Sequence, residues 1–193
     1  MSLLEEIKGY VVRVEKVVRE KYQVLLTPFR EMRINSVIEI DIPGRANYRL
    51  AHLVLDVSGT IASDGELISG VADRIAKLRS SVEVHLITAD THGRQEEIDA
   101  ELGIEGRRLQ SGATEEEQKA DFVRWLGNEG TVTIGNGAND ALMLREAALG
   151  IAVLGKEGLS VVAFQNADLV VVNILDALDL LLHPKRLVAT LRR

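Results

Sequence analysis

A short apolar run ends in an acid, a hydroxyl residue, a glycine and a threonine at Asp56-Val57-Ser58-Gly59-Thr60. The run has the composition of a strand buried on both faces, so the Asp56 carboxylate should emerge at its carboxyl end, where open parallel sheets bind ligands. A carboxylate there can attack phosphorus or hold a metal ion. Gly59 lets backbone N–H groups approach an anion, and the Ser58 and Thr60 hydroxyls can donate hydrogen bonds. Taken alone, the pentapeptide is explained equally well by a strand and a simple turn.

A second polar loop follows another apolar run, at Gly135-Asn136-Gly137-Ala138-Asn139-Asp140. It carries three short polar side chains within five positions, separated by residues with little or no side chain. Amide and carboxylate oxygens placed in this way can surround a small hard cation. An ordinary Asn/Gly loop that begins a helix would explain the glycines, but not the clustering of the three oxygen-bearing side chains.

A parallel sheet would bring these two loops together. The apolar periodicity predicts strands and helices in alternation, an order typical of a parallel α/β sheet with helices on both faces. The expected strands are 37–42, the run ending at Asp56, 82–88, 131–135 and 150–153, and the expected helices are 70–80, 93–102, 115–128 and 140–148. Residues 2 to about 22 have the spacing of an amphipathic helix. We therefore expect a helical N-terminal extension over residues 1–35 and a catalytic domain over residues 36–193.

The order of the motifs resembles that of the haloacid dehalogenase (HAD) superfamily of phosphohydrolases. The matching segments are Asp56–Thr60, Leu86-Ile87-Thr88-Ala89-Asp90, Lys119 and Gly135–Asp140. The match is closer to the phosphorylation domain of P-type ATPases, and closest to the group called soluble P-type ATPases, from about Ser36 to the C-terminus. The resemblance implies a HAD-like Rossmannoid fold.

The resemblance also implies phosphoryl transfer through an aspartyl-phosphate on Asp56, with Mg²⁺ as cofactor. It assigns catalytic roles to Asp56, Ser58, Thr88 and Lys119, substrate binding to Gly59, Thr60, Ala89 and Asn139, and metal binding to Asp56, Ser58, Asn136 and Asp140. Without the resemblance, Thr88 is a turn residue and Lys119 belongs to an ordinary charged helix start.

Two positions depart from the pattern of ordinary HAD phosphatases. Ser58 stands where those enzymes carry a second acid, which protonates the leaving group and then activates water. A serine cannot do this near neutral pH, so we expect slow turnover and a long-lived phospho-Asp56. Asn136 stands where most members have a metal-binding Asp, so we expect weaker Mg²⁺ binding, with Asp140 carrying more of the ligation. These departures keep a competing hypothesis open, namely a regulatory or interaction module that binds phosphate and hardly turns over.

The intervals between motifs are short. About 27 residues separate Thr60 from Thr88 and about 30 separate Thr88 from Lys119, too few for a cap domain or for the nucleotide-binding domain of the pumps. We therefore expect a capless protein that is not itself an ion pump, and ATP is a doubtful substrate. A phosphorylated small molecule or a phosphoprotein is the expected substrate, and a homo-oligomer is expected to close the site.

Composition supports a cytoplasmic enzyme without nucleic-acid or membrane partners. The chain of 193 residues has 46% hydrophobic residues, a net charge of −6 and no cysteine. No apolar run approaches the roughly 20 residues of a membrane span, and no clustered basic surface is visible. The four histidines have no metal-ligand spacing in the sequence, and we expect them to serve in packing.

Overall fold

The computed structural model describes residues 37–90 and 93–193. The predicted helical extension over residues 1–35 lies outside them and stays a prediction. The described chain contains a six-stranded parallel sheet with the strand order β10-β9-β8-β3-β6-β7. Its strands are β3 (His52–Asp56), β6 (Glu83–Thr88), β7 (Arg107–Arg108), β8 (Thr131–Gly135), β9 (Leu149–Val153) and β10 (Leu169–Val171). The predicted fold class, a parallel α/β sheet, is confirmed.

Two antiparallel pairs and seven helices complete the described chain. The pairs are β1 (Ile38–Ile42) with β2 (Ala46–Leu50), and β4 (Ala62–Ser63) with β5 (Glu66–Leu67). The helices are α2 (Val71–Leu78), α3 (Gln95–Leu102), α4 (Glu115–Leu126), α5 (Ala141–Glu146), α6 (Val161–Asn166), α7 (Ile174–Leu182) and α8 (Pro184–Leu191). Short 3₁₀ turns lie at Asn128–Gly130 and Ala138–Asp140.

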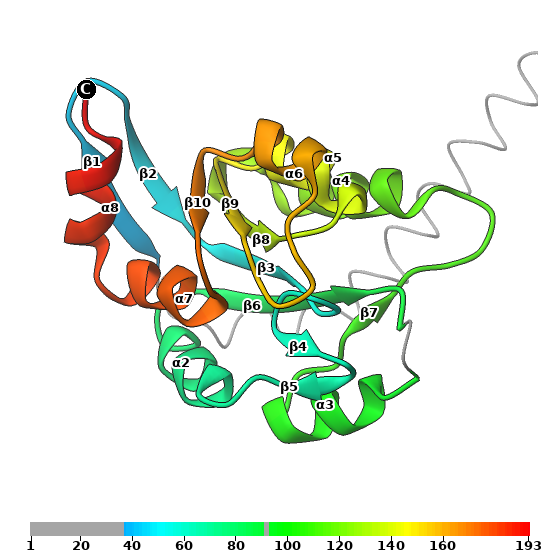
Figure 1. The fold of residues 1–193 in the computed structure, drawn as a ribbon. Helices are drawn as coiled ribbons and strands as arrows, with labels where there is room; N and C mark the ends of the chain where they lie inside the picture. The colour runs from blue at the N-terminus through cyan, green and yellow to red at the C-terminus, as the bar shows by residue number, and fades with distance from the viewer. Residues whose placement is uncertain (1–36, 91–92) are drawn as a thin grey trace, which may run out of the picture. The chain divides into compact units, whose positions relative to one another are not determined.

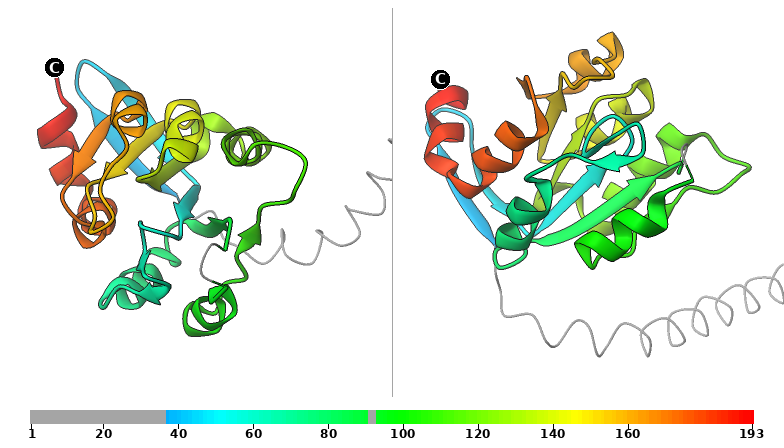
Figure 2. Two further views of the ribbon diagram at one scale, coloured as in Figure 1. Left: turned by 45° about the vertical axis from the view of Figure 1, so that its right-hand side comes forward. Right: turned by 60° about the horizontal axis from the view of Figure 1, so that its bottom comes forward.

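Helices cover both faces of the sheet, as predicted (Figure 1). α2, α3 and α7 contribute buried apolar side chains to one large core, and α4, α5 and α6 pack on the opposite face. The β1–β2 hairpin and α8 lie together at one end of the sheet (Figure 2). In β1, Ile38, Ile40 and Ile42 are buried and alternate with exposed residues, which confirms the half-buried strand expected from the period of two.

The order of the strands creates a switch point beside β3. From β3 the chain continues to β6 and β7 on one side, and later to β8, β9 and β10 on the other. Leu55 of β3 is in register with Ile134 of β8, and Asp56 with Ile87 of β6. The loops that follow these three strands therefore meet at one edge of the sheet, which is where open α/β sheets bind ligands.

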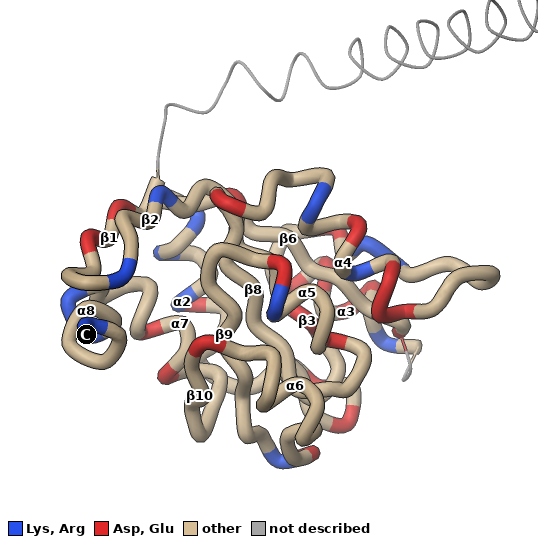
Figure 3. The backbone as a smooth tube through the Cα atoms, turned by 90° about the horizontal axis from the view of Figure 1, so that it is seen from above, with Lys and Arg blue, Asp and Glu red and all other residues tan. Residues whose placement is uncertain are grey.

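The segments between the motif loops are as short as the sequence spacing indicated. The β4–β5 hairpin and α2 lie between β3 and β6, and α3 and β7 lie between β6 and α4. Acidic and basic residues are interspersed along the described chain (Figure 3). Among the described residues, no helix is long and apolar enough to cross a membrane.

Candidate active site

Asp56 ends β3, and a tight turn wraps around its carboxylate. The backbone N–H groups of Thr60, Ile61 and Ala62 all donate to the Val57 carbonyl, at 3.2, 3.1 and 3.0 Å. Gly59 adopts a φ of +78°, which glycine tolerates without steric cost. The Asp56 side chain is buried, with 4% of the residue exposed. The sequence expectation of a buried strand delivering a carboxylate to a glycine turn is confirmed.

Lys119 of α4 is buried between two carboxylates. Its Nζ donates to Asp56 Oδ1 and to Asp140 Oδ1, both at 2.7 Å. Only 1% of Lys119 is exposed. A buried ammonium is costly unless it is paired and hydrogen-bonded, and these two contacts supply both conditions. α4 begins at the Thr114 cap, whose hydroxyl accepts a hydrogen bond from the Glu117 backbone N–H.

Asp140 is fully buried and fixes the loop after β8. Its Oδ2 accepts hydrogen bonds from the backbone N–H groups of Asn136 and Gly137, at 2.9 and 2.8 Å. A Cβ on Gly135 would lie 2.5 Å from the Asp140 carboxyl carbon, so only glycine leaves room for this carboxylate. With Oδ1 on Lys119, both oxygens of Asp140 have protein partners. The structure thus places Asp140 where it orients Lys119 and the loop; its role as a metal ligand stays a prediction.

Thr60 joins the two motif loops. Its Oγ1 lies 2.9 Å from Asp56 Oδ2 and 2.9 Å from Asn136 Oδ1. A hydroxyl has one proton, so Thr60 can donate to only one of these oxygens at a time. The Asn136 amide is held by Nδ2, which donates to the Gly158 carbonyl at 3.2 Å, so its oxygen faces Thr60. Oxygens from both loops therefore converge on one buried position.

The loop after β6 supplies a third side of the site. Thr88 is fully buried, and its Oγ1 accepts a hydrogen bond from the Asp90 backbone N–H at 2.9 Å. Ala89 is exposed on the same loop. Ser58 and Asp90 help to line a small pocket beside the site, together with Arg94 of the turn that precedes α3.

Asn139 has a different set of contacts from the rest of the predicted site. Its Nδ2 donates to Glu115 Oε2 at 2.6 Å, at the first turn of α4. Asn139 thus connects the loop after β8 to the helix that carries Lys119. Its predicted role in substrate binding remains untested.

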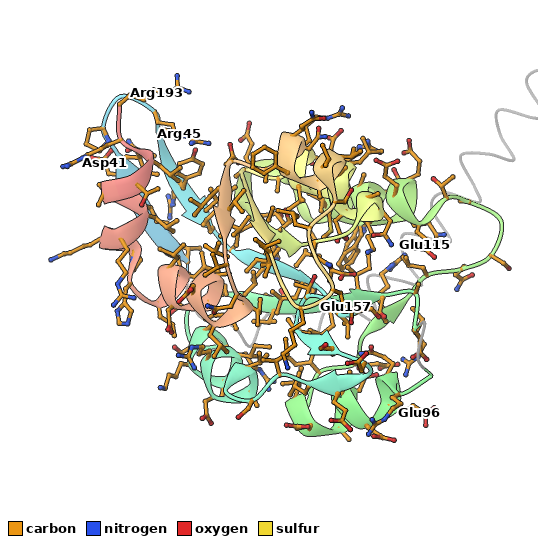
Figure 4. All side chains as sticks on the ribbon, in the orientation of Figure 1. Asp41, Arg45, Glu96, Glu115, Glu157 and Arg193 are labelled. Atoms are coloured by element: carbon orange, nitrogen blue, oxygen red, sulfur yellow. The ribbon has the colours of Figure 1, made fainter. Side chains whose placement is uncertain are left out.

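Sequence reasoning did not identify Glu157, an acid on the loop between β9 and α6 (Figure 4). Its Oε1 accepts a hydrogen bond from the Asp64 backbone N–H at 3.3 Å, so it connects this loop to the β4–β5 hairpin. A Cβ on Gly59 would lie 2.9 Å from Glu157 Oε2 and 2.8 Å from Asn136 Nδ2. A single acid about 100 residues from Asp56 gives no signal in the sequence that could have identified it.

Comparison with known proteins agrees with this arrangement. No family model matches the chain. A curated relative, the soluble P-type ATPase-like phosphatase of Methanocaldococcus jannaschii, is 30% identical over 128 residues, which are 65% of this chain and 46% of that protein. A zinc-transporting P-type ATPase, solved in its E2·Pi state, superposes with a TM-score of 0.52 and 28% sequence identity. The superposed region covers 64% of this chain and 20% of the ATPase. The chain thus spans less than half the length of either protein.

A third similarity extends over most of a single-domain phosphatase. The 3-deoxy-D-manno-octulosonate 8-phosphate phosphatase of Moraxella catarrhalis, solved with magnesium and phosphate ions, superposes with a TM-score of 0.54 and 20% identity. The aligned region covers 74% of this chain and 94% of that phosphatase. The chain has the fold of the HAD phosphatases, and its sequence is similar to P-type ATPase-like members of that superfamily.

The buried charges of this site do not balance. Asp56 and Asp140 carry two negative charges against the single positive charge of Lys119. Burial, aided by the negative charge of Asp140, raises the pKa of Asp56 to about 7, while Lys119 and Thr60 act in the opposite direction. Burial also acts to lower the pKa of Lys119, but the two carboxylates outweigh it and raise that pKa. Lys119 is therefore a permanent cation in this site.

We expect Lys119→Met to destabilise the HAD fold by about 3–5 kcal/mol at pH 8, because it leaves two buried carboxylates without a cation. Burial already raises the pKa of Asp56, and loss of the Lys119 cation raises it further, so the loss of stability should diminish as the pH falls toward 5 and Asp56 gains a proton. Urea unfolding at the two pH values measures this. Lys156→Met, at an exposed lysine of the β9–α6 loop, is the matched control. A Lys119→Met protein within about 1 kcal/mol of the wild type at pH 8 would contradict the pairing.

The raised pKa of Asp56 predicts a pH-dependent nucleophile. In metal-free protein, ¹³C NMR of the aspartate carboxyl carbons should reveal one group titrating near pH 7, which Asp56→Asn removes. Asp56 is protonated below that pH and a carboxylate above it. Mg²⁺ should move the titration to lower pH, because a bound cation favours the charged form. Titration of every aspartate below about pH 5 in the metal-free protein would contradict this assignment.

Proposed function

We propose that the protein is a Mg²⁺-dependent phosphohydrolase or phosphotransferase that acts through an aspartyl-phosphate on Asp56. The observation that supports this most strongly is the ammonium of Lys119 held 2.7 Å from Asp56, at the switch point of the sheet. In the proposed step an Asp56 oxygen attacks phosphorus in line. The bond from phosphorus to the leaving group breaks, and the leaving group departs with that electron pair.

The neighbouring residues have separate roles in this proposal. Lys119 offsets negative charge on the nucleophile and on the phosphoryl group. The Thr88 hydroxyl already accepts a hydrogen bond from the Asp90 backbone, so its own proton is available for a phosphate oxygen. The backbone N–H group of Ser58, at the start of the turn, is suited to bind the same group. Asp140 acts through Lys119 as a positioning residue.

The donor set suits a small hard cation. The buried site has one net negative charge, and side-chain oxygens of Asp56 and Asn136 both lie beside Thr60. We propose that Asp56, Asn136 and Ser58 hold Mg²⁺, with Asp140 supporting the loop from behind. When bound, Mg²⁺ would neutralise charge that develops on the transferring phosphoryl group. Because Asn136 brings no formal charge, weak binding is part of the proposal.

The substrate is proposed to be a phosphorylated small molecule or a phosphoprotein. Among the described residues, the chain segments between the motifs are too short to form a cap, so a large substrate or a second copy of the chain is proposed to shield the site from water. Ser58 lacks a useful acid or base, so dephosphorylation of Asp56 is proposed to be slow.

The first experiment is phosphoprotein formation and phosphate release from acetyl phosphate, p-nitrophenyl phosphate and ATP, with and without Mg²⁺. We expect Mg²⁺-dependent labelling that Asp56→Asn abolishes and that Asp64→Asn, on the exposed β4–β5 turn, retains. The preferred donor then distinguishes a phosphatase from an ATP user. If folded wild-type protein gives neither labelling nor turnover with any donor, the alternative applies, a phosphate-binding module of HAD fold.

Ser58→Asp should accelerate dephosphorylation of phospho-Asp56, because it supplies the acid/base group that ordinary HAD phosphatases use. Such groups contribute about 10²- to 10⁴-fold, so a gain of at least about tenfold is expected in a chase of labelled protein. Ser69→Asp, at an exposed serine before α2, should leave the chase unchanged. An unchanged rate in Ser58→Asp would show that slow turnover has another cause.

A further inference from the structure

Two histidines and a glutamate meet at the opposite end of β3 from Asp56. His52 is the first residue of β3, and it is in register with Glu83, the first residue of β6. His85 lies two residues further along β6, so its side chain is on the same face of the sheet as that of Glu83. Asp56 is four residues along β3 from His52, which at about 3.3 Å per residue separates the two positions by roughly 13 Å. The cluster is therefore distinct from the phosphoryl-transfer site.

The ligand atoms of these residues have the spacing of a metal site. His52 Nδ1 lies 3.2 Å from His85 Nε2 and 3.6 Å from Glu83 Oε2. One donor atom from each residue lies within 4.8 Å of the other two. Ligands bound tetrahedrally at about 2.0–2.1 Å from a zinc ion lie about 3.4 Å apart, a value between the two observed contacts. Among residues 37–90 and 93–193, this is the one group of three His, Cys, Asp or Glu side chains with that property.

We propose that His52, Glu83 and His85 bind a late first-row divalent cation such as Zn²⁺. Two imidazoles and one carboxylate are the donor types that such ions prefer, whereas Mg²⁺ prefers a site built from oxygens alone. Three protein ligands leave a fourth position for water or for a further ligand. The bound ion would join the first residues of β3 and β6, the two strands that also carry Asp56 and Thr88.

The surroundings hold the imidazoles in place. The His85 ring packs edge-on against Phe122 of α4, with ring centroids 5.5 Å apart. Phe122 in turn stacks on Trp125, at 5.8 Å, and Arg107 lies over its ring. Burial lowers the pKa of His52, although Glu83 acts to raise it, and the neutral imidazole is the form that binds metal. Side chains whose ligand atoms already have the spacing that a metal ion requires lose little conformational freedom when the ion binds.

Fluorescence of a nearby tryptophan can report metal binding at this cluster. Trp125 is the only tryptophan of the protein, and a single ring, Phe122, separates it from His85. Co²⁺ absorbs visible light when bound by nitrogen and oxygen ligands in a four- or five-coordinate site. Binding of Co²⁺ at the cluster should therefore quench Trp125 fluorescence and give a visible absorption band in the same titration.

The test is calorimetric titration of the full chain with Zn²⁺ in the presence of excess Mg²⁺, which occupies the oxygen-ligand site of the proposed function. We expect one Zn²⁺ per chain, with affinity lowered about tenfold or more in His52→Gln, His85→Gln and Glu83→Gln. His183→Gln, at an exposed histidine between α7 and α8, is the control and should bind as the wild type does. Asp56→Asn should also retain the site, which separates this proposal from the proposed function.

Unchanged Zn²⁺ affinity in the cluster variants, or loss of Zn²⁺ binding in Asp56→Asn alone, would overturn the proposal. The proposal also fails if the wild type binds no Zn²⁺, or if Co²⁺ binds without quenching Trp125. Glu83→Gln keeps the test decisive should a histidine variant fail to fold, because the Glu83 side chain is 44% exposed and its replacement is nearly isosteric.

Discussion

The arrangement of the molecule depends on one buried ammonium shared by two carboxylates. Lys119, Asp56 and Asp140 come from α4, β3 and the loop after β8, and they must meet within hydrogen-bonding distance. Displacing Lys119 leaves two uncompensated carboxylates in the protein interior, which is among the costliest defects a fold can contain. Several local features can be understood from this constraint, including the glycine at position 135, whose missing side chain makes room for Asp140.

The same arrangement of charges lowers the stability of the fold and favours metal binding. Two buried carboxylates around one ammonium oppose folding when no metal ion is bound. The same excess negative charge would attract a divalent cation to this edge of the sheet, where Asp56 is the proposed nucleophile. A better balanced site would make a more stable protein with less reason to bind metal. The raised pKa of Asp56 reflects this imbalance directly.

The sequence predicted the sheet and the strands that carry the site, because their apolar periods and glycine turns are local signals. The short strands β2, β4, β5 and β7 and the elements after residue 153 were not predicted. Asn173 caps α7 by accepting a hydrogen bond from the Asp176 backbone N–H, which the sequence could have suggested. The motif order placed Asp56, Lys119 and Asp140 in one site. It could not indicate that both Asp140 oxygens have protein partners, or that His52 and His85 meet, since such contacts depend on register between strands.

The close contact between the turn after β3 and the loop after β8 limits how this site can vary. Gly59 has no room for a side chain because the Asn136 amide lies against it, so the shapes of the two loops are fixed together. Asparagine and aspartate have nearly the same shape, however, and differ at this position by one charge and by the hydrogen bond that Asn136 Nδ2 donates to the Gly158 carbonyl. A single-residue exchange at position 136 could thus reset the ionic character of the centre with an adjustment confined to the contact with Gly158. Related chains could diverge in metal preference along this route without remodelling their loops.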